Sequence, residues 1–430
     1  MHKIERLLQT LAPKGVEFRK LGEVCESTNK KTLKISEVSE VKNKGMYPVI
    51  NSGRDLYGYY HDFNNDGENI TIASRGEYAG FINYFNEKFF AGGLCYPYKV
   101  KDTNELLTKF LYFYLKTNEI QIMENLVSRG SIPALNKADI ETLTIPIPPL
   151  EIQQEIVTIL DAFTELNAEL NAELNARKKQ YQYYQNMLLD FNDINQNRKD
   201  AKERLAQKPY PKRLKTLLQT LAPKGVEFRK LGDIGEYIRG VTYKKNQEIN
   251  NLECGIKVLR ANNITLSNHL NFEDIKVINK NVKIRKEQYL KKNDILICAG
   301  SGSSEHIGKV AFINTDFDYV FGGFMGVIRI REVNSRFVYH IFTSNIFKQY
   351  LEKSLNTTTI NNLNANILQN FLIPIPPLEI QQEIVTILDQ FSALTTDLQA
   401  GIPAEIKARK KQYEYYREKL LTFKPLQNKE

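Results

Sequence analysis

The sequence IPIPPLEIQQEIVTILD at residues 145–161 decides the fold, because all seventeen letters return at residues 373–389. In both copies prolines interrupt the preceding segment. Apolar residues then follow at spacings of four and three, which places them on one face of a helix. The chain therefore contains the same helix start twice, 228 residues apart.

Two further blocks recur in the same order. LLQTLAPKGVEFRKLG at 7–22 is repeated without change at 217–232, and RKKQYQYYQNMLLDF at 177–191 returns as RKKQYEYYREKLLTF at 409–423 with ten of fifteen residues identical. Repeats of this kind are the signature of an internal duplication. We call the repeated blocks the frame.

Between the frame blocks lie two segments, insert 1 (about 23–143) and insert 2 (about 233–371), which share almost no letters. Their likeness is one of pattern. NITIASRGEYAGFINYF in insert 1 and DILICAGSGSSEHIGKVAFI in insert 2 each predict a strand, a glycine-containing turn and a second strand. The chain thus alternates a constant frame with two variable inserts.

The first frame helix should be long. Its apolar stripe continues past the prolines and predicts one helix of about 40 residues, or roughly 60 Å, through Ile152, Ile156, Ile159, Phe163, Leu166 and Leu170. Within it, residues 165–176 are three copies of ELNA. This four-residue period adds an extra four-step at Leu174, a stutter in the heptad.

The second frame helix should be interrupted. Gly401 and Pro403 are poor helix-interior residues, and they predict a break followed by a second helix from about Pro403 to Leu421. Both apolar stripes are too long for one domain to cover, so we expect the two frame helices to pair antiparallel under the pseudo-twofold symmetry of the duplication. The alternative is that each helix packs only on its neighbouring domain.

Composition excludes several classes of protein. With 430 residues, 42% hydrophobic and 25% charged, and a mean hydropathy of -0.41, the chain predicts two to four folded domains. No apolar run approaches the roughly 18 residues of a membrane span, and the N-terminus lacks a signal-peptide core, so a cytoplasmic protein is expected. The cysteines, predicted to be core thiols, are widely spaced: Cys25, Cys95, Cys254 and Cys298.

The net charge of +9 is unevenly distributed. Residues 211–372 carry +10, whereas residues 1–150 carry +1. A basic domain suits a polyanion such as nucleic acid, although proteins that never bind DNA can be equally basic.

Signatures of catalysis are missing from the sequence. Gly302, Gly308 and Lys309 superficially resemble a phosphate-binding loop, but five residues separate the glycines and Val310 stands where Ser or Thr would bind magnesium. No amino-methyltransferase motif is present. The five histidines lack metal-ligand spacing: His2, His61, His269, His306 and His340. We therefore predict a non-catalytic chain with no cofactor and no metal.

The frame resembles that of the specificity subunits of type I restriction-modification systems. The resemblance rests on LAPKGVEFRKLG, IPIPPLEIQQEIV and GIPAEIKARKKQYEYYREKLL, and it covers essentially the whole chain. It implies that each insert is a target recognition domain for one half of a bipartite site in double-stranded DNA. It further implies two methyltransferase subunits that modify adenine, restriction subunits that add ATP-driven translocation and cleavage, and a role for the tetrapeptide repeats in half-site spacing.

The expected fold class is α+β, with two globular α/β target recognition domains joined by two long conserved helices in an antiparallel coiled coil. The expected boundaries are 1–148 for the first recognition domain with an N-terminal conserved helix, 149–191 for the central helical region, 192–208 for a linker, 209–376 for the second recognition domain and 377–430 for the C-terminal helical region.

Candidate DNA contacts are polar residues in loops near predicted strand ends. Arg suits guanine and Asn suits adenine in the major groove, while Lys suits phosphate. In insert 1 the candidates are Lys30, Lys31, Arg54, Arg75, Tyr78 and Arg129. In insert 2 they are Arg239, Lys244, Lys245, Arg260, Asn262 and Asn263.

Two alternatives remain open at this point. The chain could serve a system whose methylase and nuclease share one polypeptide, which partner stoichiometry would reveal. It could also be a non-DNA scaffold that joins proteins through its coiled coil, in which case its complexes would show no sequence preference.

Overall fold

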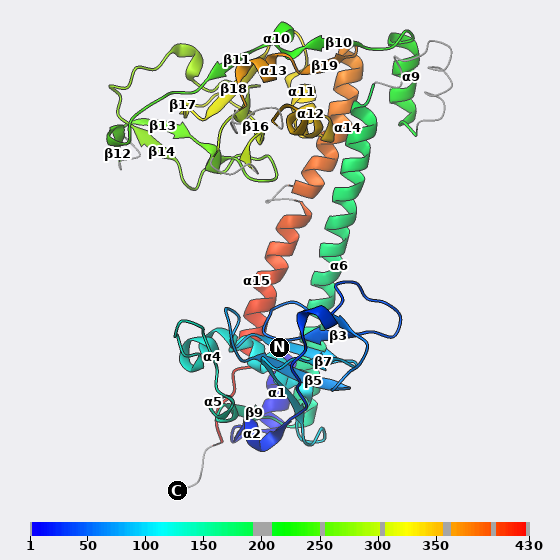
Figure 1. The fold of residues 1–430 in the computed structure, drawn as a ribbon, viewed down its shortest axis with the longest axis vertical. Helices are drawn as coiled ribbons and strands as arrows, with labels where there is room; N and C mark the ends of the chain where they lie inside the picture. The colour runs from blue at the N-terminus through cyan, green and yellow to red at the C-terminus, as the bar shows by residue number, and fades with distance from the viewer. Residues whose placement is uncertain are drawn as a thin grey trace. The chain divides into compact units, whose positions relative to one another are not determined.

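The computed structural model describes residues 2–191, 209–249, 254–301, 306–355, 363–396 and 401–426. The predicted linker, 192–208, lies outside these residues. Contacts divide the chain into two compact units (Figure 1). Unit 1 comprises Met1–Asn171 with Ile406–Glu430, and unit 2 comprises Ala172–Glu405.

Unit 1 contains insert 1 as two small sheets with helices beside them. One sheet has the order β2-β8-β5-β6, formed by Cys25–Ser27, Cys95–Val100, Glu68–Ala73 and Ile82–Asn86. The other has the order β4-β3-β7, formed by Gly58–Tyr60, Tyr47–Ile50 and Phe90–Ala91. The helices are α1 (His2–Leu11), α2 (Leu21–Val24), α3 (Thr108–Thr117), α4 (Glu119–Leu126) and α5 (Lys137–Glu141).

Unit 2 contains insert 2 in the corresponding arrangement. Its first sheet has the order β11-β18-β15-β16, formed by Gly235–Arg239, Met325–Ile330, Ile295–Cys298 and Val310–Phe312. Its second has the order β12-β14-β13-β17, formed by Glu248–Ile249, Lys276–Ile278, Ile256–Leu259 and Tyr319–Phe321. The helices are α9 (Lys212–Leu221), α10 (Leu231–Ile234), α11 (Ser335–Phe342), α12 (Asn345–Leu355) and α13 (Ala365–Gln369).

The two inserts therefore share a topology although their sequences share almost no residues. In each, an antiparallel four-stranded sheet is followed by a sheet containing one parallel pair, β3 with β7 or β13 with β17. The predicted strand, turn and strand are present as β5–β6 and β15–β16. Insert 2 adds the short strand β12 at the edge of its second sheet.

The frame closes each insert with a two-stranded sheet. Strand β1 (Glu17–Lys20) pairs with β9 (Thr144–Ile147), and β10 (Glu227–Lys230) pairs with β19 (Leu372–Ile375) in the same register. Pro146 and Pro374 thus lie within strands β9 and β19. Two-stranded sheets accept proline because both of their strands are edges.

The frame helices follow the sequence prediction. Helix α6 (Leu150–Leu189) is one helix of 40 residues. The second copy is divided into α14 (Leu378–Thr396) and α15 (Ile402–Leu420), which confirms the break near Gly401.

The two helix copies pair in a reciprocal way. In unit 1 the ring of Phe163 in α6 stacks on Tyr416 in α15 at 5.5 Å. In unit 2 the equivalent frame residue, Phe391 in α14, stacks on Tyr184 in α6 at 5.1 Å. In both cases the first half of one copy meets the last half of the other, which is the antiparallel order predicted from the duplication.

Burial mostly agrees with the sequence analysis. Three of the four cysteines are buried, and burial raises the pKa of Cys25 and of Cys95 to about 12. Cys254 is exposed, so the prediction of a core thiol was wrong there; it lies in the loop before β13 rather than within a strand. Among the described residues no helix combines the length and the apolar character of a membrane span.

Candidate nucleic-acid interface

In unit 1, four strand ends meet at the Gly-Gly turn, which we define as Gly92, Gly93 and Leu94 in insert 1. The backbone N–H of Gly92 donates to Ile50 O at the end of β3, at 2.8 Å. Lys31 N donates to Ala91 O at 3.0 Å, and Ser74 N, after β5, donates to Leu94 O at 2.9 Å. The turn thereby joins the loops that follow β2, β3, β5 and β7.

Unit 2 contains the same turn at Gly322, Gly323 and Phe324. Gly322 N donates to Leu259 O at 2.9 Å, and Val241 N donates to Phe321 O at 2.7 Å. The N–H groups of Ala299 and Gly300 donate to Phe324 O, both at 2.9 Å. The two inserts therefore gather equivalent loops around equivalent backbone atoms.

The second glycine of each turn lies against a threonine side chain, which leaves little room for a Cβ. A Cβ on Gly93 would lie 2.5 Å from Thr32 Oγ1, and a Cβ on Gly323 would lie 3.1 Å from the equivalent Thr242 Oγ1. The residue after the glycines is large, apolar and turned outward: Leu94 is 40% exposed and Phe324 is 73% exposed.

The predicted residues of insert 1 lie in the loops that the turn joins. Lys30 Nζ donates to Gly93 O at 3.3 Å, and its pKa is lowered, chiefly by burial. The guanidinium of Arg54 lies 5.9 Å from the centroid of the Tyr78 ring. The backbone of Arg75 forms an isolated β-bridge with Ala134, and Ala134 forms another with Ser128. The loop that carries Arg129 therefore lies beside Arg75.

Most of these side chains face solvent. Tyr78 is half-buried, and the other predicted residues of insert 1 are exposed: Lys30, Lys31, Arg54, Arg75 and Arg129.

In insert 2 an open cavity of about 1020 Å³ lies next to the Gly-Gly turn, and it is lined by part of the predicted set. Four of them contribute to its wall together with Gly322, Gly323 and Phe324: Arg239, Lys245, Arg260 and Asn262. Lys244 is exposed beside Lys245 but does not line the cavity. Arg260 also pairs with Asp274 at 2.8 Å.

Asn263 is placed differently. Its side chain is 1% exposed. The amide oxygen accepts from Arg260 N at 2.8 Å, and the amide nitrogen donates to Asn271 O and Asp274 O. These bonds use the polar atoms that a base contact would need, so Asn263 shapes the loop that presents Arg260 and Asn262.

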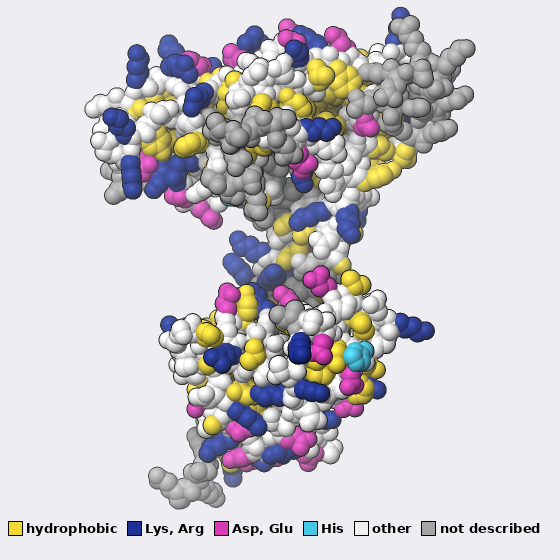
Figure 2. Space-filling view, viewed as in Figure 1, with side chains coloured by type: hydrophobic (Ala, Val, Ile, Leu, Met, Phe, Trp, Pro, Cys, Tyr) yellow, Lys and Arg dark blue, Asp and Glu magenta, His cyan; other side chains and the backbone are white. Residues whose placement is uncertain are grey.

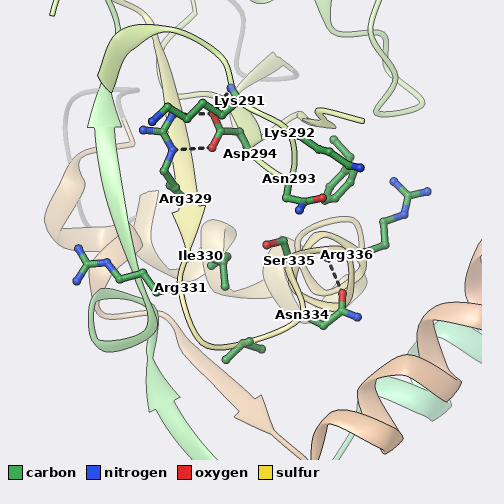
Figure 3. Close-up of a pocket in the computed structure, with 12 residues that line it drawn as sticks. Lys291, Lys292, Asn293, Asp294, Arg329, Ile330, Arg331, Asn334, Ser335 and Arg336 are labelled. Atoms are coloured by element: carbon green, nitrogen blue, oxygen red, sulfur yellow. Dashed lines mark hydrogen bonds and ion pairs between the residues drawn. The ribbon is translucent and has the colours of Figure 1, made fainter. Parts of the chain in front are cut away.

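A second basic cavity, of about 490 Å³, lies where β18 leads into α11 (Figure 3). Its lining includes five cations, Lys291, Lys292, Arg329, Arg331 and Arg336. The buried carboxylate of Asp294 binds Arg329 through two hydrogen bonds of 2.8 Å, drawn as dashed lines in Figure 3. On the face drawn in Figure 2, Lys and Arg side chains gather over the strand-rich part of unit 2, whereas in unit 1 they are interspersed with Asp and Glu.

The Gly-Gly turn was missed by the sequence analysis, although a signal was present. FAGGLC at 90–95 and FGGFM at 321–325 both contain two glycines followed by a large apolar residue. Each group lies immediately before a strand, β8 or β18.

The chain is similar to known proteins over most of its length. A family model described as "Type I restriction modification DNA specificity domain" matches residues 13–177 and 223–408. A Haemophilus influenzae chain named for a type I restriction enzyme specificity subunit is 31% identical over 98% of both chains. The EcoR124I/EcoR124II specificity subunit of Escherichia coli is 28% identical over 98% of this chain and 97% of its own length.

A solved structure has the same fold. The crystal structure of a type I restriction-modification S subunit from M. genitalium aligns with a TM-score of 0.60 at 16% identity, covering 97% of this chain and 98% of that chain. With the matched frame and the two equivalent inserts, these similarities show that the chain belongs to the DNA specificity subunits of type I restriction-modification systems.

Proposed function

We propose that each insert reads one half of a bipartite DNA site with the surface around its Gly-Gly turn. The observation that carries this proposal is the repetition of the turn in two inserts whose surrounding side chains differ. Equivalent backbone holds unlike residues at equivalent places, as two independent readers of two half-sites require. Helix α6 is continuous over 40 residues and about 60 Å long. One DNA turn measures roughly 34 to 36 Å, so the helix is long enough to span the distance between half-sites one turn apart.

The side chains around each turn divide by chemistry. Lysines supply salt-sensitive phosphate contacts, and Arg and Asn supply hydrogen bonds to base edges. In insert 1 the proposed contacts are Lys30, Lys31, Arg54, Arg75, Tyr78 and Arg129. In insert 2 they are Arg239, Lys244, Lys245, Arg260 and Asn262, with Asn263 as a positioning residue. We add Leu94 and Phe324 as apolar contacts to bases.

The chain itself is proposed to be non-catalytic. Two methyltransferase subunits dock on the frame helices, one for each copy of the repeat, and restriction subunits join the full complex. The duplicated frame supports this stoichiometry, because two equal surfaces suit two equal partners. The proposed domain boundaries remain 1–148, 149–191, 192–208, 209–376 and 377–430.

Single arginine variants in the assembled methyltransferase complex test the proposal. Arg75→Ala should relax or abolish recognition in one half-site, and Arg239→Ala should do so in the other. The loss of one good base contact costs about 1 to 3 kcal/mol, or roughly five- to 150-fold in discrimination. Long-read mapping of methylated adenines reports each half separately.

Lys224→Ala, an exposed frame lysine, serves as the control and should leave the methylated motif unchanged. If both arginine variants altered the same half-site, or neither altered any letter, the proposed division of labour between the inserts would be wrong.

A further inference from the structure

A buried glutamine of the frame binds the backbone of each insert. Gln153 and Gln381 hold the same position in the repeat and are 0% and 2% exposed. Gln153 Oε1 accepts from Leu107 N, the residue before α3, at 2.8 Å. Gln381 Oε1 accepts from Asn334 N, the residue before α11, at 2.9 Å. Because the donor is a backbone N–H, the contact does not depend on the side chain that the insert supplies there.

The same amide is fixed from the other side by the frame. Gln153 Nε2 donates to Pro148 O at 2.7 Å, and Gln381 Nε2 donates to Pro376 O at 2.6 Å. The proline carbonyl before each frame helix thus orients the glutamine toward the insert.

A second frame residue, about two helical turns further on, binds a cation of the insert. Asp161 pairs with Lys109 at 2.7 Å, and the equivalent Asp389 pairs with Arg336 at 2.8 Å. Each cation also faces a ring on the edge strand of the insert's four-stranded sheet, β6 or β16. Lys109 lies 5.8 Å from Tyr84, and Arg336 lies 4.8 Å from Phe312.

The helix starts that make these contacts share a short sequence. Residues 108–112 read TKFLY and residues 335–339 read SRFVY: a hydroxyl residue, a cation, phenylalanine, an aliphatic residue and tyrosine. Phe110 and Phe337 are both 0% exposed. The inserts otherwise share almost no letters, and the contacts with the frame account for this local likeness.

We propose that these residues form a latch that orients each insert on its frame helix. The frame contributes Gln153 with Asp161, or Gln381 with Asp389. The insert contributes the backbone N–H before its first long helix and the cation two residues later. Such a latch accepts unrelated inserts in one orientation, because it requires only a backbone group and a single side-chain type. In Figure 3, Asn334 and Arg336 lie together at the start of α11.

The contacts of the latch do not depend on the proposed function. Only their consequence, the correct orientation of each insert toward its half-site, rests on it. The residues of the latch are positioning residues and contact no DNA in this proposal. Loosening the latch should therefore leave the letters of both half-sites unchanged and should broaden the range of spacer lengths that the complex accepts.

The experiment exchanges charges in unit 1, in the full chain assembled with its methyltransferase subunits. Asp161→Lys should lower methylation at the normal spacer by about two- to fivefold, the range expected for a partly exposed ion pair. Methylation of sites whose spacer is one base pair longer or shorter should rise as methylation at the normal spacer falls. The double variant Asp161→Lys with Lys109→Asp should recover most of the loss, and Asp161→Asn is the milder variant should the reversal impair folding.

Glu151→Lys, an exposed carboxylate on the first turn of the same helix, is the matched control and should change nothing. A thermal-unfolding cycle on the wild type, Asp161→Lys, Lys109→Asp and the double variant measures the coupling without DNA. Additive effects of the two single substitutions in that cycle, or a reduced methylation level with unaltered spacer tolerance, would overturn the latch. A wild-type complex that methylated no bipartite site would refute the proposed function, while the unfolding cycle would still decide the latch.

Discussion

Phe324 is the most exposed large apolar side chain among the described residues, at 73%, and it lies in a cavity wall otherwise rich in cations. Water solvates such a side chain poorly, so its position is explained if DNA covers it. A base or a thymine methyl group offers the apolar surface that fits.

Phe324→Ala should weaken specific binding of the assembled complex by about tenfold, since stacking or methyl contact contributes about 1 to 3 kcal/mol. The dependence of affinity on salt should not change, because no ion is released by an apolar contact. Lys245→Ala should instead reduce the salt slope by about 0.9 if it binds one phosphate. Titrations with labelled DNA at several salt concentrations separate the two effects.

Leu266→Ala provides the control, because Leu266 is 70% exposed in the same insert and does not line the cavity. Equal losses for Phe324→Ala and Leu266→Ala would contradict a DNA contact at Phe324.

His340 is a fully buried titratable residue at the latch of unit 2. Its ring lies 2.8 Å from Asp389 Oδ1 in α14 and 3.4 Å from the Tyr181 hydroxyl in α6, with Arg336 on the same carboxylate. Burial lowers the pKa of His340 below its ordinary 6.5, despite the hydrogen bond to Asp389. The pKa of Asp389 is also lowered: burial opposes this, but the bond to His340 and the charge of Arg336 outweigh it.

The lowered pKa makes stability depend on pH in a definite direction. Below the ordinary pKa the unfolded chain binds a proton at this histidine that the folded chain does not yet bind. The contribution of neutral His340 to the stability of the fold is therefore complete above about pH 6.5. It is lost as the pH falls toward the lowered pKa of His340 in the folded protein. Insert 1 has Phe113 at the equivalent place, so His340→Phe should reduce the fall in melting temperature between about pH 8 and about pH 5. An undiminished fall in the variant would show that another group is responsible.

At the scale of elements, the ELNA repeats lie within the uninterrupted helix α6. Removing Glu169–Ala172 deletes about 6 Å of helix and about 400° of winding, or roughly 40° beyond a full turn. One base pair contributes about 3.4 Å and roughly 34 to 36°. The angles nearly match, and an insert that faces away from its groove cannot read it, so rotation should decide the outcome.

We therefore expect the deletion to shorten the unread spacer by one base pair and to leave both half-sites unchanged. Ile402 and Ile406 in α15 are four residues apart and both 8% exposed, which offers an apolar stripe for re-pairing; Leu398 of the same stripe lies outside the described residues. Methylome mapping of the deletion variant gives the answer. An unchanged spacer would mean that this helix does not measure the distance.

At the scale of the molecule, the duplicated frame predicts independent inserts. Replacing residues 233–371 with the insert of another family member should change one half of the methylated sequence and preserve the other, because the frame contacts around each insert are the same. Transplanting the corresponding segment into 23–143 should change the opposite half. A single replacement that changed both halves would refute independence.

The assembled complex should also differ from the isolated chain in cofactor binding. Because its sequence contains no cofactor motif, we expect the isolated chain to bind no S-adenosylmethionine, whereas the complex with two methyltransferase subunits binds it and methylates DNA. Calorimetry on both preparations measures this, and binding by the chain alone would contradict the prediction.

The sequence by itself determined the duplication, the 40-residue helix, the helix break near Gly401 and one strand pair in each insert. The duplication follows from comparing distant blocks of sequence. The other features follow from letters near one another, since apolar spacing, proline and glycine act over a few residues. It also placed Arg239, Lys245, Arg260 and Asn262 near strand ends; the fold brings these four residues to one cavity.

Only the tertiary structure decided the equivalence of the inserts, the Gly-Gly turn as the meeting point of four loops, the burial of Asn263 and the latch. The physical reason is that backbone hydrogen bonds join these places, and a backbone N–H or carbonyl is the same whichever side chain accompanies it. Leu107 and Asn334 share no chemistry as side chains, yet both present the N–H that a frame glutamine accepts. Contacts of that kind leave almost no trace in the letters and become visible only when distant segments are brought together.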